Sequence, residues 1–217
     1  MRFLLIFILI VAVSCKRDEP LAAAKNNSDT TAFRSFGYDY SNNYLELLPK
    51  SIMPGKPYQY WAYVEHINGY EKASFEIFKE AGDTLLRRGT DSLPASGGFF
   101  KRGQFTTRGD FIVVIENDSL SYISTDSGLR EFLGTIDNVN EAVLLAETFH
   151  YGPDYESGGN DYRIVNGAYE LNLIAFDPFP SCVGGIEYDT EKKVTVTKDG
   201  FIKAVSREKN NTSTNTE

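Results

Sequence analysis

The chain has 217 residues, with 22 Lys and Arg against 30 Asp and Glu, two His and two Cys. Two His and two Cys are too few for the usual zinc or iron–sulfur sites, which need about four nitrogen or sulfur ligands. The formal net charge of −8 would repel a phosphate backbone, so the composition argues against nucleic acid as a partner. A hydrophobic content of 41% is ordinary for a globular protein and excludes a chain that is disordered throughout.

The first residues have the order of a secretory leader. A short basic start, Met1-Arg2, precedes an unbroken apolar run over residues 3–13. As a helix this run would span about 16 Å, roughly half of a bilayer core, so it is too short for a stable membrane span. A basic start, an apolar stretch and a small-residue cleavage site are typical of a signal peptide, which we predict for residues 1–14.

The end of this leader points to lipid attachment. The sequence Ala12-Val13-Ser14-Cys15 resembles the lipobox of bacterial lipoproteins, in which the cysteine is acylated and becomes the first residue of the mature chain. The family usually has Leu in place of Ala12, so cleavage by an ordinary signal peptidase is the alternative. The resemblance implies two or three acyl chains on Cys15, enough for stable anchoring in a membrane. An acylated Cys15 leaves Cys182 without a disulfide partner in the chain.

The residues after the cysteine bear on location. Lys16-Arg17-Asp18-Glu19 resembles the surface-export signal of Bacteroidetes-type lipoproteins, a Lys followed closely by acidic residues. This resemblance implies a protein anchored in the outer membrane and displayed on the cell surface. The alternative is a charged, solvated start to a tether, with the protein on the periplasmic face. For residues 15–35, which are polar and aperiodic, we predict the lipidated cysteine and a flexible tether of about 25 Å root-mean-square reach.

Residues 36–125 carry only strand signals, short and separated by turns. Residues 58–66 alternate between two faces, as a strand does. Residues 74–80 and 84–88 are predicted to form a hairpin, because residues 81–83 are a connection of hairpin length with a glycine. Short strands with frequent turn signals favour a β-sandwich domain over this region.

One segment of this region has a family resemblance. Residues 111–115 are a continuous, β-branched run, typical of a buried strand. Together with Gly109-Asp110 they loosely resemble the late core strand of immunoglobulin-like domains, although the usual cysteines and Trp pattern are absent. The resemblance implies an immunoglobulin-like sandwich for residues 36–125.

The period of the apolar residues changes after residue 125. Over residues 126–151 they recur three and four positions apart, which predicts two helices. Asn138 followed by Glu141 is close to the capping-box pattern at the start of the second helix, and Gly152-Pro153 is predicted to end it.

Two hairpins are predicted beyond the helices. Asn166-Gly167 and Lys198-Asp199-Gly200 each lie between two strand-like segments and are strong turn signals. The class predicted for the whole chain is therefore α+β, with residues 126–208 forming a small domain of two helices packed on an antiparallel sheet. Residues 209–217 are predicted to be a disordered tail. The stretch that runs from residues 129–132 through 140–142 to 180–182 resembles a pattern in uncharacterised small Bacteroidetes-type proteins, and this resemblance implies no activity.

Catalytic chemistry has little support in the sequence. Cys182 and His150 are a conceivable nucleophile and base, but their spacing neither forbids nor supports contact, and a small buried hydrophobe is the favoured interpretation of Cys182. Phosphate-binding, dinucleotide-binding, zinc-protease and serine-hydrolase motifs do not occur. We therefore predict no catalytic residue, no enzyme activity and no cofactor.

Two further clusters have plainer explanations. The densest oxygen cluster does not have the spacing of an EF-hand calcium loop, so a solvated loop is favoured and no metal is predicted; it comprises Asp154, Glu156, Asn160 and Asp161. Arg108-Gly109-Asp110 spells the integrin-binding tripeptide, but it leads directly into the strand at 111–115. A turn at the entry to that strand is the favoured interpretation.

Aromatic residues offer one candidate ligand platform. If Tyr60, Ala62 and Val64 face the core, Trp61 and Tyr63 point outward, and their rings would suit sugars. The alternative is that Trp61 itself belongs to the core, with both faces of the strand buried.

The function predicted from these patterns is that of a non-catalytic lipoprotein. It would be held to the membrane by its lipid and would act as a binding or interaction module for an unknown envelope protein. The alternative is a glycan-binding accessory lipoprotein that uses Trp61 and Tyr63. An extracytoplasmic hydrolase is a third hypothesis, for which the sequence suggests no substrate.

Overall fold

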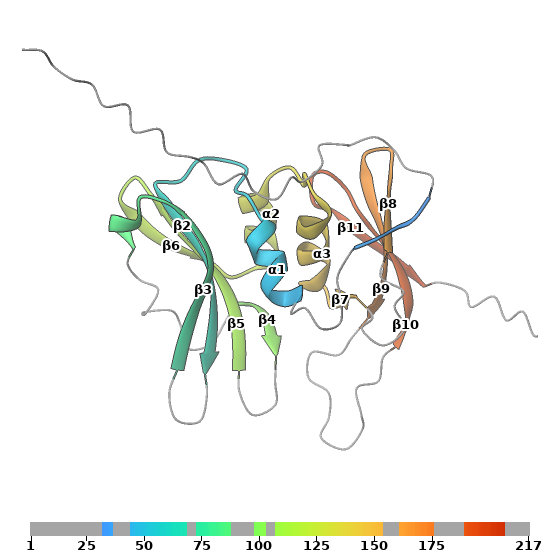
Figure 1. The fold of residues 1–217 in the computed structure, drawn as a ribbon, viewed down its shortest axis with the longest axis horizontal. Coiled ribbons are helices and arrows are strands. Elements are labelled where there is room, and N and C mark those ends of the chain that lie inside the picture. Colours follow the sequence, from blue (N-terminus) through green and yellow to red (C-terminus); the bar gives the residue numbers. More distant parts are fainter. Residues whose placement is uncertain are drawn as a thin grey trace, which may run out of the picture.

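The structure is a computed structural model, and it describes residues 32–36, 44–68, 73–87, 98–102, 107–153, 161–175 and 189–206. Cys15, Cys182 and the predicted signal peptide and tail lie outside these residues. The described elements form three layers, with helices between two antiparallel sheets (Figure 1). The helices are α1 (Tyr44–Ser51), α2 (Asp126–Leu133) and α3 (Val139–Glu147).

The first sheet, which we call the N-terminal sheet, has the order β3-β2-β5-β4, and β6 also pairs with β5. Its strands are β2 (Tyr60–Asn68), β3 (Ala73–Gly82), β4 (Phe99–Arg102), β5 (Thr107–Glu116) and β6 (Ser119–Ile123). The buried strand predicted at 111–115 is confirmed and lies in the C-terminal half of β5. The described strands between 36 and 125 thus lie in a single sheet, and an immunoglobulin-like fold is not confirmed.

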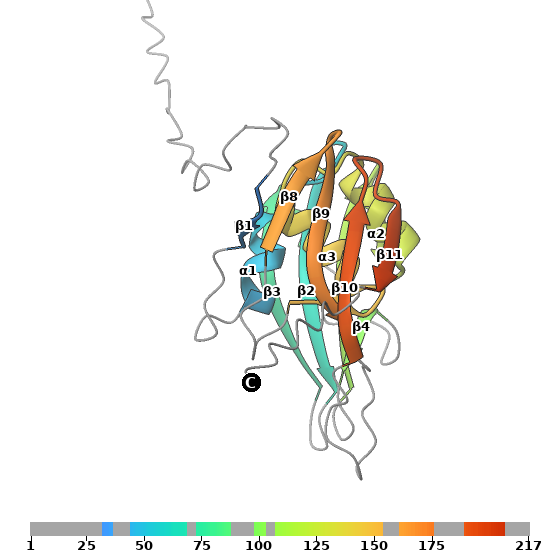
Figure 2. The same ribbon diagram turned by 90° about the vertical axis from the view of Figure 1, so that its right-hand side faces the viewer.

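The second sheet, the C-terminal sheet, has the order β1-β8-β9-β10-β11, and β7 also pairs with β9 (Figure 2). Its strands are β1 (Arg34–Ser35), β7 (Tyr151–Gly152), β8 (Asp161–Val165), β9 (Ala168–Ala175), β10 (Asp189–Val196) and β11 (Ile202–Ser206). Both predicted hairpins are confirmed. Asn166 and Gly167 have φ of 51° and 74°, as a two-residue turn of type I′ requires.

Helices α2 and α3 confirm the predicted pair. Thr125 caps α2 by accepting a hydrogen bond from Gly128 N at 3.1 Å, and Asn138 caps α3 by accepting one from Glu141 N at 3.0 Å. The predicted end of α3 at Gly152 is wrong. The helix stops at Glu147, and His150 then turns the chain with a φ of 64° so that Tyr151 and Gly152 can join β9 as β7.

Three sequence predictions for the N-terminal part need correction. Helix α1 was not predicted; it is short and contains Pro49, which favours a turn interpretation. The tether predicted to reach residue 35 stops earlier, because Arg34 and Ser35 form β1 and pair with β8. The predicted hairpin at 74–88 is also wrong, since β3 runs on to Gly82 and pairs with β2, and Thr84–Leu86 is a 3₁₀ turn, η1.

One hydrophobic core joins the three layers. Buried side chains from both sheets and all three helices belong to the same cluster, in which Trp61 of β2 packs edge-on against Phe132 of α2 at 5.3 Å between ring centroids. The division predicted between residues 125 and 126 falls at the N-cap of α2. It marks the change from strands to helices, and the hydrophobic core is continuous across it.

Candidate functional site

The predicted aromatic platform is buried. Trp61 is 3% exposed and Tyr63 is fully buried, and both face the helices. The opposite face of the strand, with Tyr60, Ala62 and Val64, is fully buried as well. The predicted ligand platform is therefore wrong. The alternative, in which Trp61 belongs to the core, is confirmed.

The other predicted site residues are scattered. His150 is exposed after α3, whereas Cys182 lies outside the described residues, as do Asp154, Glu156 and Asn160. Asp161 lies in β8 and accepts a hydrogen bond from Asn172 of β9. No group of three or more His, Cys, Asp or Glu side chains is placed to hold a metal ion in the part of the chain that is described.

The Arg108-Gly109-Asp110 tripeptide lies within β5 and not in a loop. Asp110 accepts a hydrogen bond from the Tyr63 hydroxyl at 2.6 Å, which ties β5 to β2 on the face toward the helices. The turn predicted at the entry to the strand is therefore wrong, because this segment is already part of β5. The Asp110 carboxylate makes a hydrogen bond that supports the fold.

A bulge in β3 shapes the surface of the N-terminal sheet. Tyr63 pairs with Lys79 while Val64 pairs with Ile77, so Phe78 is an extra residue in β3. The extra residue changes which side chains face each side of the sheet. Phe78 and Lys79 both reach the helix side, and Glu80 turns to the opposite side, where it meets Tyr60.

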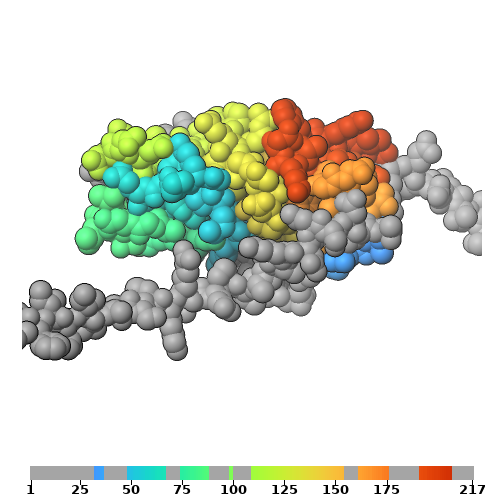
Figure 3. Space-filling view, turned by 90° about the horizontal axis from the view of Figure 1, so that it is seen from above, coloured from blue at the N-terminus to red at the C-terminus, as the bar shows by residue number. Residues whose placement is uncertain are grey.

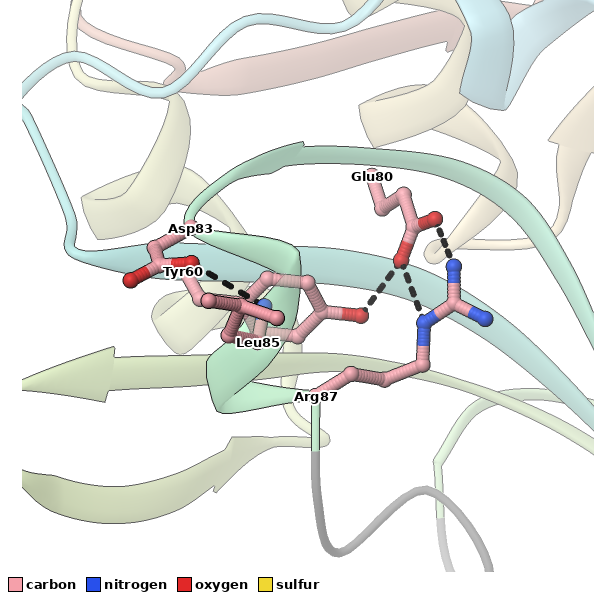
Figure 4. Close-up of polar contacts among 5 residues, drawn as sticks. All are labelled: Tyr60, Glu80, Asp83, Leu85 and Arg87. Atoms are coloured by element: carbon pink, nitrogen blue, oxygen red, sulfur yellow. Dashed lines mark hydrogen bonds and ion pairs between the residues drawn. The ribbon is translucent and has the colours of Figure 1, made fainter.

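On that opposite side, the end of β3 and η1 form a rigid corner, which we call the η1 corner and define as Tyr60, Glu80, Asp83, Leu85 and Arg87 (Figure 4). Tyr60 donates from its hydroxyl to Glu80 at 2.7 Å. Arg87 donates to both carboxylate oxygens of Glu80 from its Nε and Nη2 atoms. This two-pronged contact fixes the chain just after η1.

The turn that carries Leu85 is fixed as well. The Asp83 carboxylate accepts from Leu85 N at 3.0 Å, and Asp83 N donates to Gln59 O at 2.8 Å. Gly82 has a φ of 97°, and a Cβ there would lie 2.3 Å from Gln59 O, so only glycine fits. Leu85 projects from this turn with 93% of its surface exposed, the highest value among the large apolar side chains described.

The electrostatics of the η1 corner follow from its contacts. Burial, and then the hydrogen bond to Glu80, raises the pKa of Tyr60 to about 12. Burial by itself would raise the pKa of Glu80, but the hydrogen bonds from Tyr60 and Arg87 outweigh it and hold that pKa below its usual value. Glu80 therefore favours its ionised form, which is the form that accepts the hydrogen bonds of Tyr60 and Arg87.

A second polar cluster lies on the helix side of the bulge. Lys79 Nζ donates to Lys50 O at 2.8 Å and to Ile52 O at 2.7 Å, which caps the end of α1. Glu141 of α3, 2% exposed, accepts from Met53 N at 3.1 Å and from Asp137 N at 2.9 Å. These contacts clamp α1 to the body.

The pKa shifts in this clamp have one cause, burial. Burial raises the pKa of Glu141, while the backbone hydrogen bonds from Asp137 and Met53 act in the opposite direction. Burial lowers the pKa of Lys79, and the charge of Glu141 opposes that shift. Because both side chains are occupied with backbone groups, we assign the clamp a structural role.

Sequence reasoning found part of this arrangement. Glu141 was identified as a capping residue, but its hydrogen bonds reach Asp137 and Met53 and do not return to Asn138 N. Glu80 and Arg87 were missed, because the bulge that turns Glu80 toward Tyr60 has no local sequence signal.

Comparison with known proteins gives no family. No family model, no curated protein and no solved structure matches the chain. Among the described helices none has the length and apolar character needed to cross a membrane.

Proposed function

We propose that this protein is a non-catalytic lipoprotein of a bacterial envelope that binds a partner protein through the η1 corner. Its anchor is an acylated Cys15, and its location is the outer membrane, facing the cell surface. The anchor is supported by the lipobox-like sequence before Cys15 and the Lys16–Glu19 export pattern after it. An immunoglobulin-like relationship of residues 36–125 is not needed for this proposal.

The observation that carries the binding role is the exposure of Leu85 on a fixed turn. A backbone turn that is already fixed loses little conformational entropy when a partner buries the side chain that it carries. Anchors of this kind, surrounded by polar contacts, provide most of the affinity in many interfaces. The carboxylate of Asp83 beside Leu85, with Glu80 neutralised by Arg87, suits a partner with an apolar pocket and a basic rim.

Glycan binding is not favoured, because Trp61 and Tyr63 are both buried. A partner protein is the better match to the η1 corner, since a single aliphatic side chain offers no ring face on which a sugar could stack.

The anchor is tested by metabolic labelling with a clickable fatty acid. The native chain and Cys182→Ser should carry the label, and Cys15→Ser should lose it. Labelling of Cys15→Ser would contradict the assignment of the anchor.

Protease treatment of intact cells then distinguishes the two sides of the membrane. Cleavage of the native chain supports surface display, and protection until the outer membrane is opened supports the periplasmic face.

The binding role is tested by site-specific photo-crosslinking in living cells. A photo-reactive phenylalanine derivative in place of Leu85 should form a defined adduct with one partner. The same group in place of Lys203, an exposed residue of β11, serves as the control. The partner identified by mass spectrometry should bind the purified native chain and bind Leu85→Ala at least about tenfold more weakly, the loss expected for an anchor residue. Equal adducts at both positions, or none at position 85, would contradict the proposal.

A further inference from the structure

The chain that follows the proposed anchor enters the body at the outer edge of the C-terminal sheet. Residues 32–36 are the first described residues after Cys15, and they are held at three neighbouring positions. Arg34 pairs with Tyr162 in the sheet, and Phe36 stacks on Tyr162 with 5.7 Å between ring centroids. Phe33 lies under the Arg163 guanidinium at 4.8 Å. The body is thus attached to the preceding chain at β1.

The η1 corner lies at the other end of the molecule. It belongs to the N-terminal sheet, which the helical layer separates from the C-terminal sheet. Two views at right angles place β1 and η1 at opposite ends of the long axis (Figures 1 and 3). A membrane attached through β1 would therefore be nearest to the end that is farthest from Leu85.

From this arrangement we propose that the body stands end-on to the membrane, with the β1–β8 edge facing the lipid head groups and the η1 corner facing away. The proposal rests on the lipid anchor at Cys15. The connecting chain from Cys15 to Arg34 has a reach of about 25 Å if it is the coil that its composition predicts, so the attached end stays close to the bilayer. The η1 corner is then the part of the body best placed to meet a partner outside the membrane.

The orientation is tested on the full-length acylated protein in vesicles of phosphatidylethanolamine and phosphatidylglycerol that contain a head-group nitroxide lipid. In a Cys182→Ser background, a fluorophore is attached to Arg34→Cys, Lys203→Cys or Leu85→Cys, all at exposed positions. The nitroxide should quench the label several-fold more at position 34 than at position 85, with position 203 between them.

Two outcomes would overturn the proposal, and they are distinguishable. If the protein floats with the vesicles but positions 34 and 85 are quenched equally, the orientation is wrong and the anchor stands. If the protein carries no acyl mass and does not float with the vesicles, the proposed anchor fails and the orientation fails with it. Retention of the native unfolding midpoint by each labelled variant excludes misfolding as the cause.

Discussion

The two sheets of this protein use their outer faces differently. The N-terminal sheet buries both faces, because the side turned away from the helices carries its own apolar cluster around Val64, Phe111 and Val113. On the outer face of the C-terminal sheet, Glu170 is instead bound by Arg163 and Lys193. The N-terminal sheet thus has an apolar cluster on each face, whereas the outer face of the C-terminal sheet carries an ion-paired cluster.

This difference explains why one sheet was easier to predict than the other. Over residues 169–173 of β9 and 193–196 of β10, apolar and polar residues alternate, so the pattern distinguishes the face toward the helices from the opposite face. In β2, Tyr60 and Trp61 are both large and aromatic, and alternation alone cannot say which of them is exposed. The burial of both is a property of the tertiary structure that the strand pattern does not contain.

The largest expected effect is at Trp61. Trp61→Ala should destabilise the protein by about 3–5 kcal/mol, because it removes a buried ring that packs on Phe132. Urea unfolding followed by circular dichroism measures this loss. The matched control, Val205→Ala on the exposed edge strand β11, should change the stability by less than about 0.5 kcal/mol. A cost below about 1 kcal/mol for Trp61→Ala would mean that the ring is not in the core.

A loss of about 2–4 kcal/mol is expected for Glu141→Ala, since the backbone N–H groups of Met53 and Asp137 would lose their acceptor. The raised pKa of Glu141 also determines the direction in which the stability changes with pH. Its contribution to stability is complete below the ordinary carboxyl pKa and is lost as the pH rises through the raised folded value. The stability of the native protein should therefore fall more steeply with rising pH, in that window, than the stability of Glu141→Gln, and parallel pH curves would contradict this.

The outer faces can be compared by a reciprocal exchange of nearly isosteric residues. Val113→Thr places a hydroxyl in the buried outer cluster of the N-terminal sheet and should cost about 1–3 kcal/mol. Thr195→Val, on the polar outer face of the C-terminal sheet, should change the stability by no more than about 0.5 kcal/mol. Equal effects in chemical denaturation would show that the two faces are equivalent.

A smaller effect is expected at the η1 corner. Tyr60→Phe removes the hydrogen bond to Glu80 and should cost about 1–2 kcal/mol. Glu80 has a lowered pKa, so its stabilising contribution is present above the ordinary carboxyl pKa and is lost as the pH falls through the folded value. The gap between the native protein and Tyr60→Phe should narrow on acidification, and a gap that widens would contradict the assigned role of the Glu80 carboxylate.

The smallest effect on stability is expected at Leu85. Leu85→Ala removes an exposed side chain and should leave the unfolding free energy within about 0.5 kcal/mol of the native value. A loss of more than about 2 kcal/mol would show that Leu85 supports the fold, and it would remove the basis for the binding role that we propose for it.

The sequence predicted those parts of the fold that depend on neighbouring residues. The Asn166-Gly167 turn and the Asn138 cap are decided within a few residues, and both are present. Strand β1 and the β3 bulge depend on partners far away in the chain, so local patterns contained no sign of them. The η1 corner could not be predicted for the same reason, because the Tyr60–Glu80–Arg87 contact requires the bulge.

Strand β1 also has a consequence for the order of folding. Its pairing joins residue 34 to residue 162, so the C-terminal sheet cannot be completed until a late part of the chain has been made. Contacts between residues so far apart in sequence form slowly, because a long loop must close before they contribute any stabilisation. For a chain that emerges from its N-terminus, the first strand would stay unpaired until β8 arrives. The pairing of β1 with β8 would then also fix the body to the chain that precedes it.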